Sequence, residues 1–274
     1  MQPDWLTPAN AMPWPVSAPF RMRPNLEKLD PVAPALLLRD ELADVYRRER
    51  ERVLAAHAER AMVGTANNAV LDAILGLAPS PHAGWRGRDV ALSLQEDFVI
   101  LKQDHNTLRT EYLSVCFPSR WDPCEKLALD FAAIHAPVAD NQMLQAAGPN
   151  IMTMAFMKQP MLRHVWLIVP SASLDQHPDK NQAWWTEALL DMSPLLPNLC
   201  FRVERQTTWP LPHLQRAVFF IRLMMSPVVD VIQAAPGRAA ELATSLRSMT
   251  PEVVAFRGMT EAIPRLLAEL DHFA

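Results

Sequence analysis

The string IHAPV, residues 134–138, contains a histidine whose setting could support metal chemistry. A neutral imidazole that faces an apolar pocket can bind haem iron through one nitrogen while the other nitrogen donates to a carbonyl and fixes the tautomer. A histidine at the end of a helix can instead serve only the helix dipole and a backbone hydrogen bond. The spacing leaves both interpretations of His135 open.

The string FRVERQT, residues 201–207, carries polar side chains at every second position. Because side chains alternate along a strand, Arg202, Glu204 and Gln206 share one face. Such a face is either the solvated side of a sheet or the wall of a pocket. In a pocket, the arginine could hold a haem propionate and the glutamate could accept or relay a proton.

Arg163 comes directly before the apolar run HVWLIV, residues 164–169. A cation at the edge of a buried strand commonly pairs with a carboxylate of the neighbouring strand, so a structural ion pair is the simpler interpretation of this arginine. We interpret Cys116 as an inert buried thiol, since no nearby pattern predicts an activated thiolate there.

The composition is typical of a soluble globular protein. Half of the 274 residues are hydrophobic, and the net charge is -4, which disfavours binding to nucleic acid or to anionic lipid. No apolar run reaches the ~18 residues that a membrane helix needs, and no signal-peptide pattern is visible, so we expect a cytoplasmic protein. The three cysteines are too scattered for a disulfide framework or a zinc site.

The order of predicted elements favours an α+β fold, with strands in the middle of the chain and helices around them. A proline-rich arm over residues 1–35 is expected to precede a single domain over residues 36–274. The predicted strands are a hairpin over 89–103, a strand over 110–117, another over 164–169, and an antiparallel pair over 199–207 and 217–224. The predicted helices cover 36–61, 67–76, 122–133, 141–158, 184–190, 242–249, 251–257 and 261–270.

Several strings, in their order along the chain, resemble the haem-dependent oxidative N-demethylase family. They are VCFPSRW (115–121), EKL and IHAPV (125–138), RVERQT (202–207) and FxIR (219–222). The match is supported by QEDFVIL (95–101), YRRER (46–50) and the terminal FRGMTEAIPRLLAEL, and it spans most of residues 15–271.

The resemblance implies a PAS-like central antiparallel sheet, surrounded by helices, that encloses haem b and its iron. It also implies an enzyme, a haem-dependent oxidoreductase of the monooxygenase type that uses O₂ to oxidise an amine and releases an aldehyde. The chain has no dinucleotide-binding fingerprint and no iron–sulfur cysteine pattern, so the electrons would come from a separate flavin-containing reductase.

The resemblance also implies roles for single residues. His135 would be the axial ligand of the haem iron, and Arg163 and Glu204 would orient oxygen or substrate on the other side of the haem. Arg202 and Arg120 would bind the haem propionates.

The chain departs from the family pattern at two positions that we expect in the substrate pocket. Val165 replaces an asparagine that usually stands two residues after the arginine, and Met224 replaces a common tyrosine after FxIR. A small hydrophilic amine would lose hydrogen-bond partners there, at about 1–3 kcal/mol for each buried unsatisfied group. We therefore expect the substrate to be a bulkier or more apolar amine or an amino-acid derivative of a specialised biosynthetic pathway, and not dimethylamine.

Two other functions stay open on the sequence. The first is a haem-based gas or redox sensor without catalysis, because PAS-like folds often serve signalling. The second is a degenerate binding protein without haem, which the apolar replacements at Val165 and Met224 would allow.

Overall fold

The computed structural model describes residues 3–30, 32–77, 88–105, 107–180, 183–190 and 194–273. Within these residues, one antiparallel sheet has seven strands in the order β1-β5-β6-β7-β3-β4-β2. The strands are β1 (Glu27–Lys28), β2 (Met62–Gly64), β3 (Asp97–Asp104), β4 (Thr107–Ser114), β5 (Met161–Val169), β6 (Cys200–Leu211) and β7 (Arg216–Pro227). The predicted α+β class is confirmed, whereas the PAS-like arrangement around haem stays a prediction.

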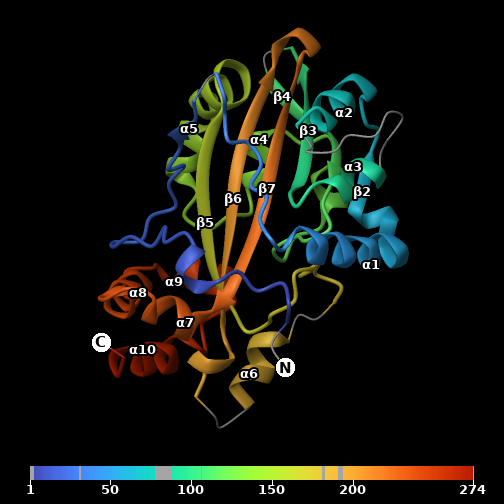
Figure 1. Ribbon diagram of the computed structural model, residues 1–274. Helices are drawn as coiled ribbons and strands as arrows, with labels where there is room; N and C mark the ends of the chain where they lie inside the picture. The colour runs from blue at the N-terminus through green and yellow to red at the C-terminus, as the bar shows by residue number, and fades with distance from the viewer. Residues whose placement is uncertain are drawn as a thin grey trace.

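Helices surround this sheet. They are α1 (Ala43–Ala61), α2 (Asn68–Leu75), α3 (Arg88–Ser93), α4 (Phe131–His135), α5 (Gln142–Thr153), α6 (Trp184–Leu190), α7 (Val228–Gln233), α8 (Arg238–Arg247), α9 (Pro251–Phe256) and α10 (Ile263–Asp271). Figure 1 shows α6–α10 gathered at one end of the long strands, α1–α3 beside β2–β4, and α4 behind the sheet. No helix in the described ranges combines the length and the apolar character needed to cross a membrane.

The predicted antiparallel pair in the second half of the chain is confirmed by β6 and β7, which form a long hairpin. Both strands are rich in β-branched and aromatic residues, which fit a pleated, half-buried surface. On one face, Phe201, Val203 and Met224 are buried in a core that α7–α10 complete. The opposite face of β6 and β7 lines the cavity described below.

The predicted hairpin over residues 89–103 is wrong. Residues 88–93 form α3, and the hairpin is made by β3 and β4 instead. The polar residues Gln95 and Glu96 were expected to form the turn, but they are 5% and 2% exposed. Their side chains accept hydrogen bonds from the backbone of Asp40 and Leu38, at 3.0 and 2.7 Å. Gln95 and Glu96 therefore hold the segment around residues 38–40 against the sheet, and they do not form a turn between two strands.

The predicted helix over residues 122–133 is broken into a short 3-10 helix, Pro123–Lys126, and the separate helix α4. Asp122 caps the first piece as predicted, because its carboxylate accepts from the amide of Cys124. Between the two pieces the chain runs beside β4, where Thr110 exchanges backbone hydrogen bonds with Ala128 and Leu129. This pairing with the sheet competes with helix formation and prevails.

The N-terminal arm is largely extended and lies on the rest of the molecule, as its prolines predict. Trp14 stacks on Phe201 with 5.3 Å between the ring centroids, and Phe20 meets Trp166 edge-on at 6.0 Å. The indole of Trp5 donates to a backbone carbonyl. These aromatic anchors hold the arm in place, and the division at residue 35 stays a prediction.

Candidate functional site

A cavity of about 540 Å³ lies between one face of the sheet and the helices α4 and α5. Side chains from five strands form its sheet wall, among them Val99, Leu101, Arg163, Val165, Leu167, Glu204, Gln206, Thr208, Phe219 and Ile221. Its helix wall contains Phe131, Ile134, His135, Leu144, Ile151, Met152 and Phe156. The volume falls in the range of ~300–1,000 Å³ that is usual for cofactor and small-molecule sites.

Helix α4 positions the histidine of the helix wall. Asp130 caps the helix, because its carboxylate accepts from the amide of Ala133 at 2.9 Å. At the other end, the side-chain amide of Asn141 donates to the carbonyls of His135 and Ala136, at 2.8 and 3.1 Å. The short helix is therefore fixed at both ends, although it has little more than one turn.

His135 lies at the C-terminal end of α4, where the sequence predicted it, and lines the cavity. Its Nδ1 lies 2.8 Å from the carbonyl oxygen of Phe131. Since a carbonyl only accepts, Nδ1 carries the proton and Nε2 keeps its lone pair. Burial lowers the pKa of His135, and Arg163 and Lys126 lower it further, although the hydrogen bond to Phe131 opposes them. The site thus favours a neutral imidazole with a free Nε2, so the backbone hydrogen bond and the metal role are compatible.

Strand pairing brings the predicted polar residues together on the sheet wall. Arg163 is paired with Gln206, and Val165 with Glu204. All four side chains line the cavity, which supports the pocket interpretation of FRVERQT over the solvated one. The predicted ion pair of Arg163 with a carboxylate of the neighbouring strand is absent among the described residues.

Glu204 is 9% exposed, and both of its oxygens accept hydrogen bonds. Ser119 donates its hydroxyl to Oε1, and Gln206 donates its amide to Oε2 at 2.7 Å. The hydroxyl of Ser119 in turn accepts from Nε of Arg202 at 2.8 Å. Because this bond occupies a lone pair of the hydroxyl, it directs the hydroxyl proton towards Glu204.

The placement of Arg202 corrects its predicted role as a ligand of the haem propionates. Its side chain does not line the cavity and is fully buried. Besides Ser119, its guanidinium donates to four backbone carbonyl oxygens, which belong to Phe117, Pro118, Ser173 and Leu174. These acceptors use the donors of the guanidinium, so Arg202 holds two loops in place and positions Ser119.

Arg120 is exposed and lines the cavity. Its backbone has a φ of 66°, and its Nη1 donates to the carbonyl of Arg257 at 2.9 Å. Gly258 makes this position possible, because a Cβ there would lie 2.9 Å from Nη1 of Arg120. Burial lowers the pKa of Arg120, and no carboxylate in the described ranges offsets this effect.

Arg257 is a cavity residue that the sequence analysis missed. It is 8% exposed, lies over the rings of Phe20 and Trp166 at 4.8 and 4.9 Å, and donates to the carbonyl of Trp166. Burial lowers its pKa to about 10. The one available signal was an arginine directly before a glycine at the end of the predicted helix 251–257. Arg120 and Arg257 lie together at one end of the cavity. Their two guanidinium groups are suited to binding carboxylates.

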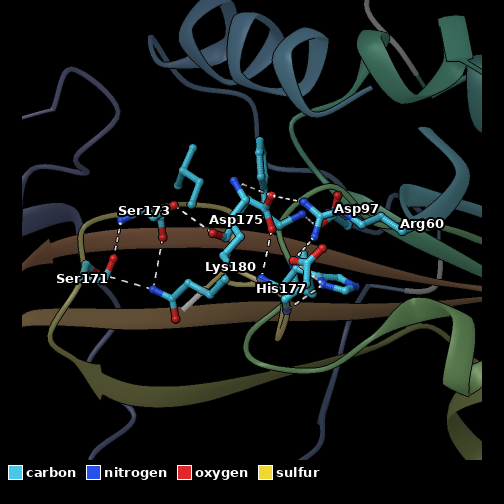
Figure 2. Close-up of polar contacts among 12 residues, drawn as sticks. Arg60, Asp97, Ser171, Ser173, Asp175, His177 and Lys180 are labelled. Carbon is cyan, nitrogen blue, oxygen red and sulfur yellow. Dashed lines mark hydrogen bonds and ion pairs between the residues drawn. The ribbon is translucent and has the colours of Figure 1, made fainter. Parts of the chain in front are cut away.

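Figure 2 shows a polar network around residues 171–180. Backbone hydrogen bonds connect this network to the segment that carries Ser119 and Arg120. Arg60 forms ion pairs with Asp175 and Asp179, and Lys180 also pairs with Asp175 at 2.9 Å. The backbone of Gln176 then bonds to both sides of Ser119, accepting from the amide of Arg120 and donating to the carbonyl of Pro118. The network thereby fixes the backbone on which Ser119 lies.

Of the two residues expected in the substrate pocket, Val165 and Met224, only Val165 lines the cavity. Val165 lines the cavity between Arg163 and Leu167. Met224 does not line it, because the alternation along β7 points it to the other face, where it is 3% exposed among core residues. The prediction for Met224 is therefore corrected.

Cys116 is buried outside the cavity wall, and burial raises its pKa to about 12. Its predicted interpretation as an inert thiol agrees with this placement. No group of three or more His, Cys, Asp or Glu side chains able to hold a metal ion occurs in the described part of the chain. A porphyrin supplies four ligands of its own, so a single imidazole is sufficient for haem. The apolar walls, the free Nε2 and the two cations fit that group.

A protein-family model described as haem-dependent oxidative N-demethylase, alpha subunit-like, matches residues 87–267, more than half of the chain. The matched range contains β3 to β7 and therefore most of the sheet wall, together with His135. No curated protein matches the chain.

Proposed function

This chain belongs to the haem-dependent oxidative N-demethylase alpha subunit-like family, and we propose that it is a haem-dependent oxidase that removes an alkyl group from an amine. The observation that carries the proposal is the position of His135. Its Nδ1 is engaged by a backbone carbonyl, and its Nε2 is available to the cavity, opposite Arg163 and Glu204 on the sheet wall.

The residues that would hold haem b lie on different sides of the cavity. His135 would bind the iron through Nε2, with Phe131 fixing the ring through its carbonyl and through ring contact at 4.1 Å between centroids. Arg120 and Arg257 would bind the two propionates, since a guanidinium matches a carboxylate in charge and geometry. The apolar side chains of both walls would cover the porphyrin.

Bound haem supplies the activation of O₂, and the protein supplies orientation and protons. Glu204 holds or moves a proton at its carboxylate, which Ser119 and Gln206 keep in one orientation. Arg163 orients the substrate or oxygen through its guanidinium. Val165 and the neighbouring apolar residues exclude water and favour a substrate bulkier than dimethylamine.

In the complete reaction on a methylamine, the substrate loses the methyl group as formaldehyde. The C–N bond breaks, the nitrogen gains a proton, and one oxygen atom leaves as water. O₂ takes up four electrons, two from the methyl group and two from a separate flavin-containing reductase, together with two protons from solvent. We propose that the protein is cytoplasmic. We also propose that residues 36–274 form the single domain that carries out this reaction.

Absorption spectroscopy tests whether His135 would bind the haem iron. Protein purified after expression with ample haem should show a Soret band that shifts on reduction with dithionite. His135→Ala should alter this band, and added imidazole should restore it in part. His164→Ala is the matched control, because His164 is close in sequence to the cavity residue Arg163 but does not line the cavity. An unaltered band in His135→Ala would show that His135 does not bind the iron.

Oxygen uptake separates the oxidase from a haem-based sensor. With a flavin reductase and a suitable amine, the protein should consume O₂ in proportion to the aldehyde that appears. A sensor would bind O₂ without such turnover.

A further inference from the structure

The sheet wall contains a half-buried cation, Arg163, that no carboxylate of the described residues pairs with. Arg163 lines the cavity from β5. Its Nε is enclosed without a hydrogen-bond partner in the described part of the chain. Burial lowers the pKa of Arg163, and the nearby charge of Glu204 only partly opposes this effect. A guanidinium that is partly removed from water and has no bonded anion is unfavourable, so this site should attract one.

Glu204 is close to Arg163 but does not pair with it. In the register of β5 and β6, Arg163 is opposite Gln206 and diagonal to Glu204, which puts their Cα atoms about 7–8 Å apart. Each oxygen of Glu204 accepts one hydrogen bond, from Ser119 and from Gln206, and keeps a second acceptor site. The wall therefore presents a cation and a carboxylate side by side, each open to a ligand.

Such a wall is complementary to a ligand that carries both charges close together. A carboxylate can take two parallel hydrogen bonds from the guanidinium of Arg163. A protonated amine on the same ligand can approach Glu204. The surrounding Val165, Phe219 and Phe156 offer an apolar surface for a hydrocarbon side chain.

We propose that the substrate is an N-alkylated amino acid with an apolar side chain, whose carboxylate binds Arg163 and whose amine faces Glu204. This inference rests on the proposed function and deepens it. It leaves Arg120 and Arg257 for the propionates of haem, since these two cations lie near the exposed Phe256 and not beside the acid. The carboxylate would fix the position of the N-alkyl group, which is the group to be oxidised.

Isothermal titration calorimetry of the purified full chain provides the test. The probes are N-methyl-L-leucine and N-methyl-L-phenylalanine, each compared with the amine that lacks the carboxylate, N-methylisopentylamine and N-methylphenethylamine. Each amino acid should bind about tenfold to a hundredfold more tightly than its counterpart, as expected for hydrogen bonds between charged groups. The methyl ester of N-methyl-L-leucine should lose this preference, because its carboxyl group is neutral.

Substitutions of Arg163 test whether this residue causes the preference for the carboxylate. Arg163→Gln should abolish the preference for the carboxylate, whereas Arg163→Lys should keep part of it. Arg47→Gln is the control, since Arg47 is an exposed residue of α1 outside the cavity. The ester comparison uses the unaltered protein, so it decides the question even if Arg163→Gln does not fold.

Equal affinities for the amino acids and the matched amines would overturn the proposal. It would also be overturned if Arg163→Gln kept the preference but released haem faster to apomyoglobin, because Arg163 would then serve a haem propionate. Calorimetry needs no haem signal. A protein that binds no haem would refute the proposed function, while the carboxylate preference would still be measured separately.

Discussion

Replacing Asp97 by asparagine should destabilise the protein strongly, although Asp97 does not line the cavity. Its carboxylate accepts from Nη1 of Arg50 at 2.6 Å and from the amides of Cys116 and Phe117 at 2.8 and 3.0 Å. The side chains of Arg50 and Asp97 are 0% and 2% exposed. Asp97→Asn keeps one acceptor for the amides but leaves the charge of Arg50 unpaired. Breaking a buried pair in this way costs about 3–5 kcal/mol, a large share of the ~5–15 kcal/mol that stabilises a typical domain.

Urea unfolding at pH 7 measures this cost, and Asp44→Asn is the matched control. Asp44 pairs with Arg47 at 3.9 Å on the surface, where its side chain is 79% exposed, so this change should cost no more than ~1 kcal/mol. Added salt should shrink the small effect at Asp44 and leave the effect at Asp97 unchanged, because buried pairs are screened little. If Asp97→Asn unfolds within about 1 kcal/mol of the unaltered protein, the buried pair does not hold the segment that leads to the cavity.

Two further predictions concern the edge of the cavity and the thiols. Gly258→Ala and Gly237→Ala should both cost about 1–2 kcal/mol in the free energy of unfolding, because φ is 69° and 82° at these glycines. Only Gly258→Ala should speed the loss of haem to apomyoglobin, since its Cβ displaces Arg120 while nothing lies within 4 Å at Gly237; equal haem loss in the two variants would contradict the role of Arg120. A thiol reagent at pH 8 should label the exposed Cys124 and spare the buried Cys116, whose pKa is about 12; rapid labelling of Cys116 before unfolding would disprove this protection.

The elements that local chemistry determines could be predicted from the sequence. The strands β6 and β7 alternate and are rich in aromatic and β-branched residues, so their existence and their pairing followed from the pattern. Asp122 before Pro123 predicted a helix start, and the structure has the cap there. The position of His135 at the end of a helix could be predicted for the same reason, because capping and proline act within a few residues.

The parts of the site that join distant segments could not be predicted. The bond between Ser119 and Glu204 joins residues 85 positions apart. The hydrogen bond from Arg120 to Arg257 spans 137 positions and depends on a left-handed residue and a facing glycine. A single sequence contains no signal for such approaches. The missed break in the helix at 122–133 has the same origin, since it results from pairing with β4.

Arg202 and Glu204 show the limit of periodicity most directly. They share a face of β6, as the alternation predicts, but only Glu204 lines the cavity. The segment that contains Phe117 and Pro118 crosses this face at Arg202 and takes up its donors through backbone carbonyls. A period of two therefore tells which way a side chain points, while the chain that crosses the face decides what it meets. The same crossing brings Ser119 to Glu204, so the engagement of Arg202 by backbone carbonyls and the fixed orientation of the acid have one structural cause.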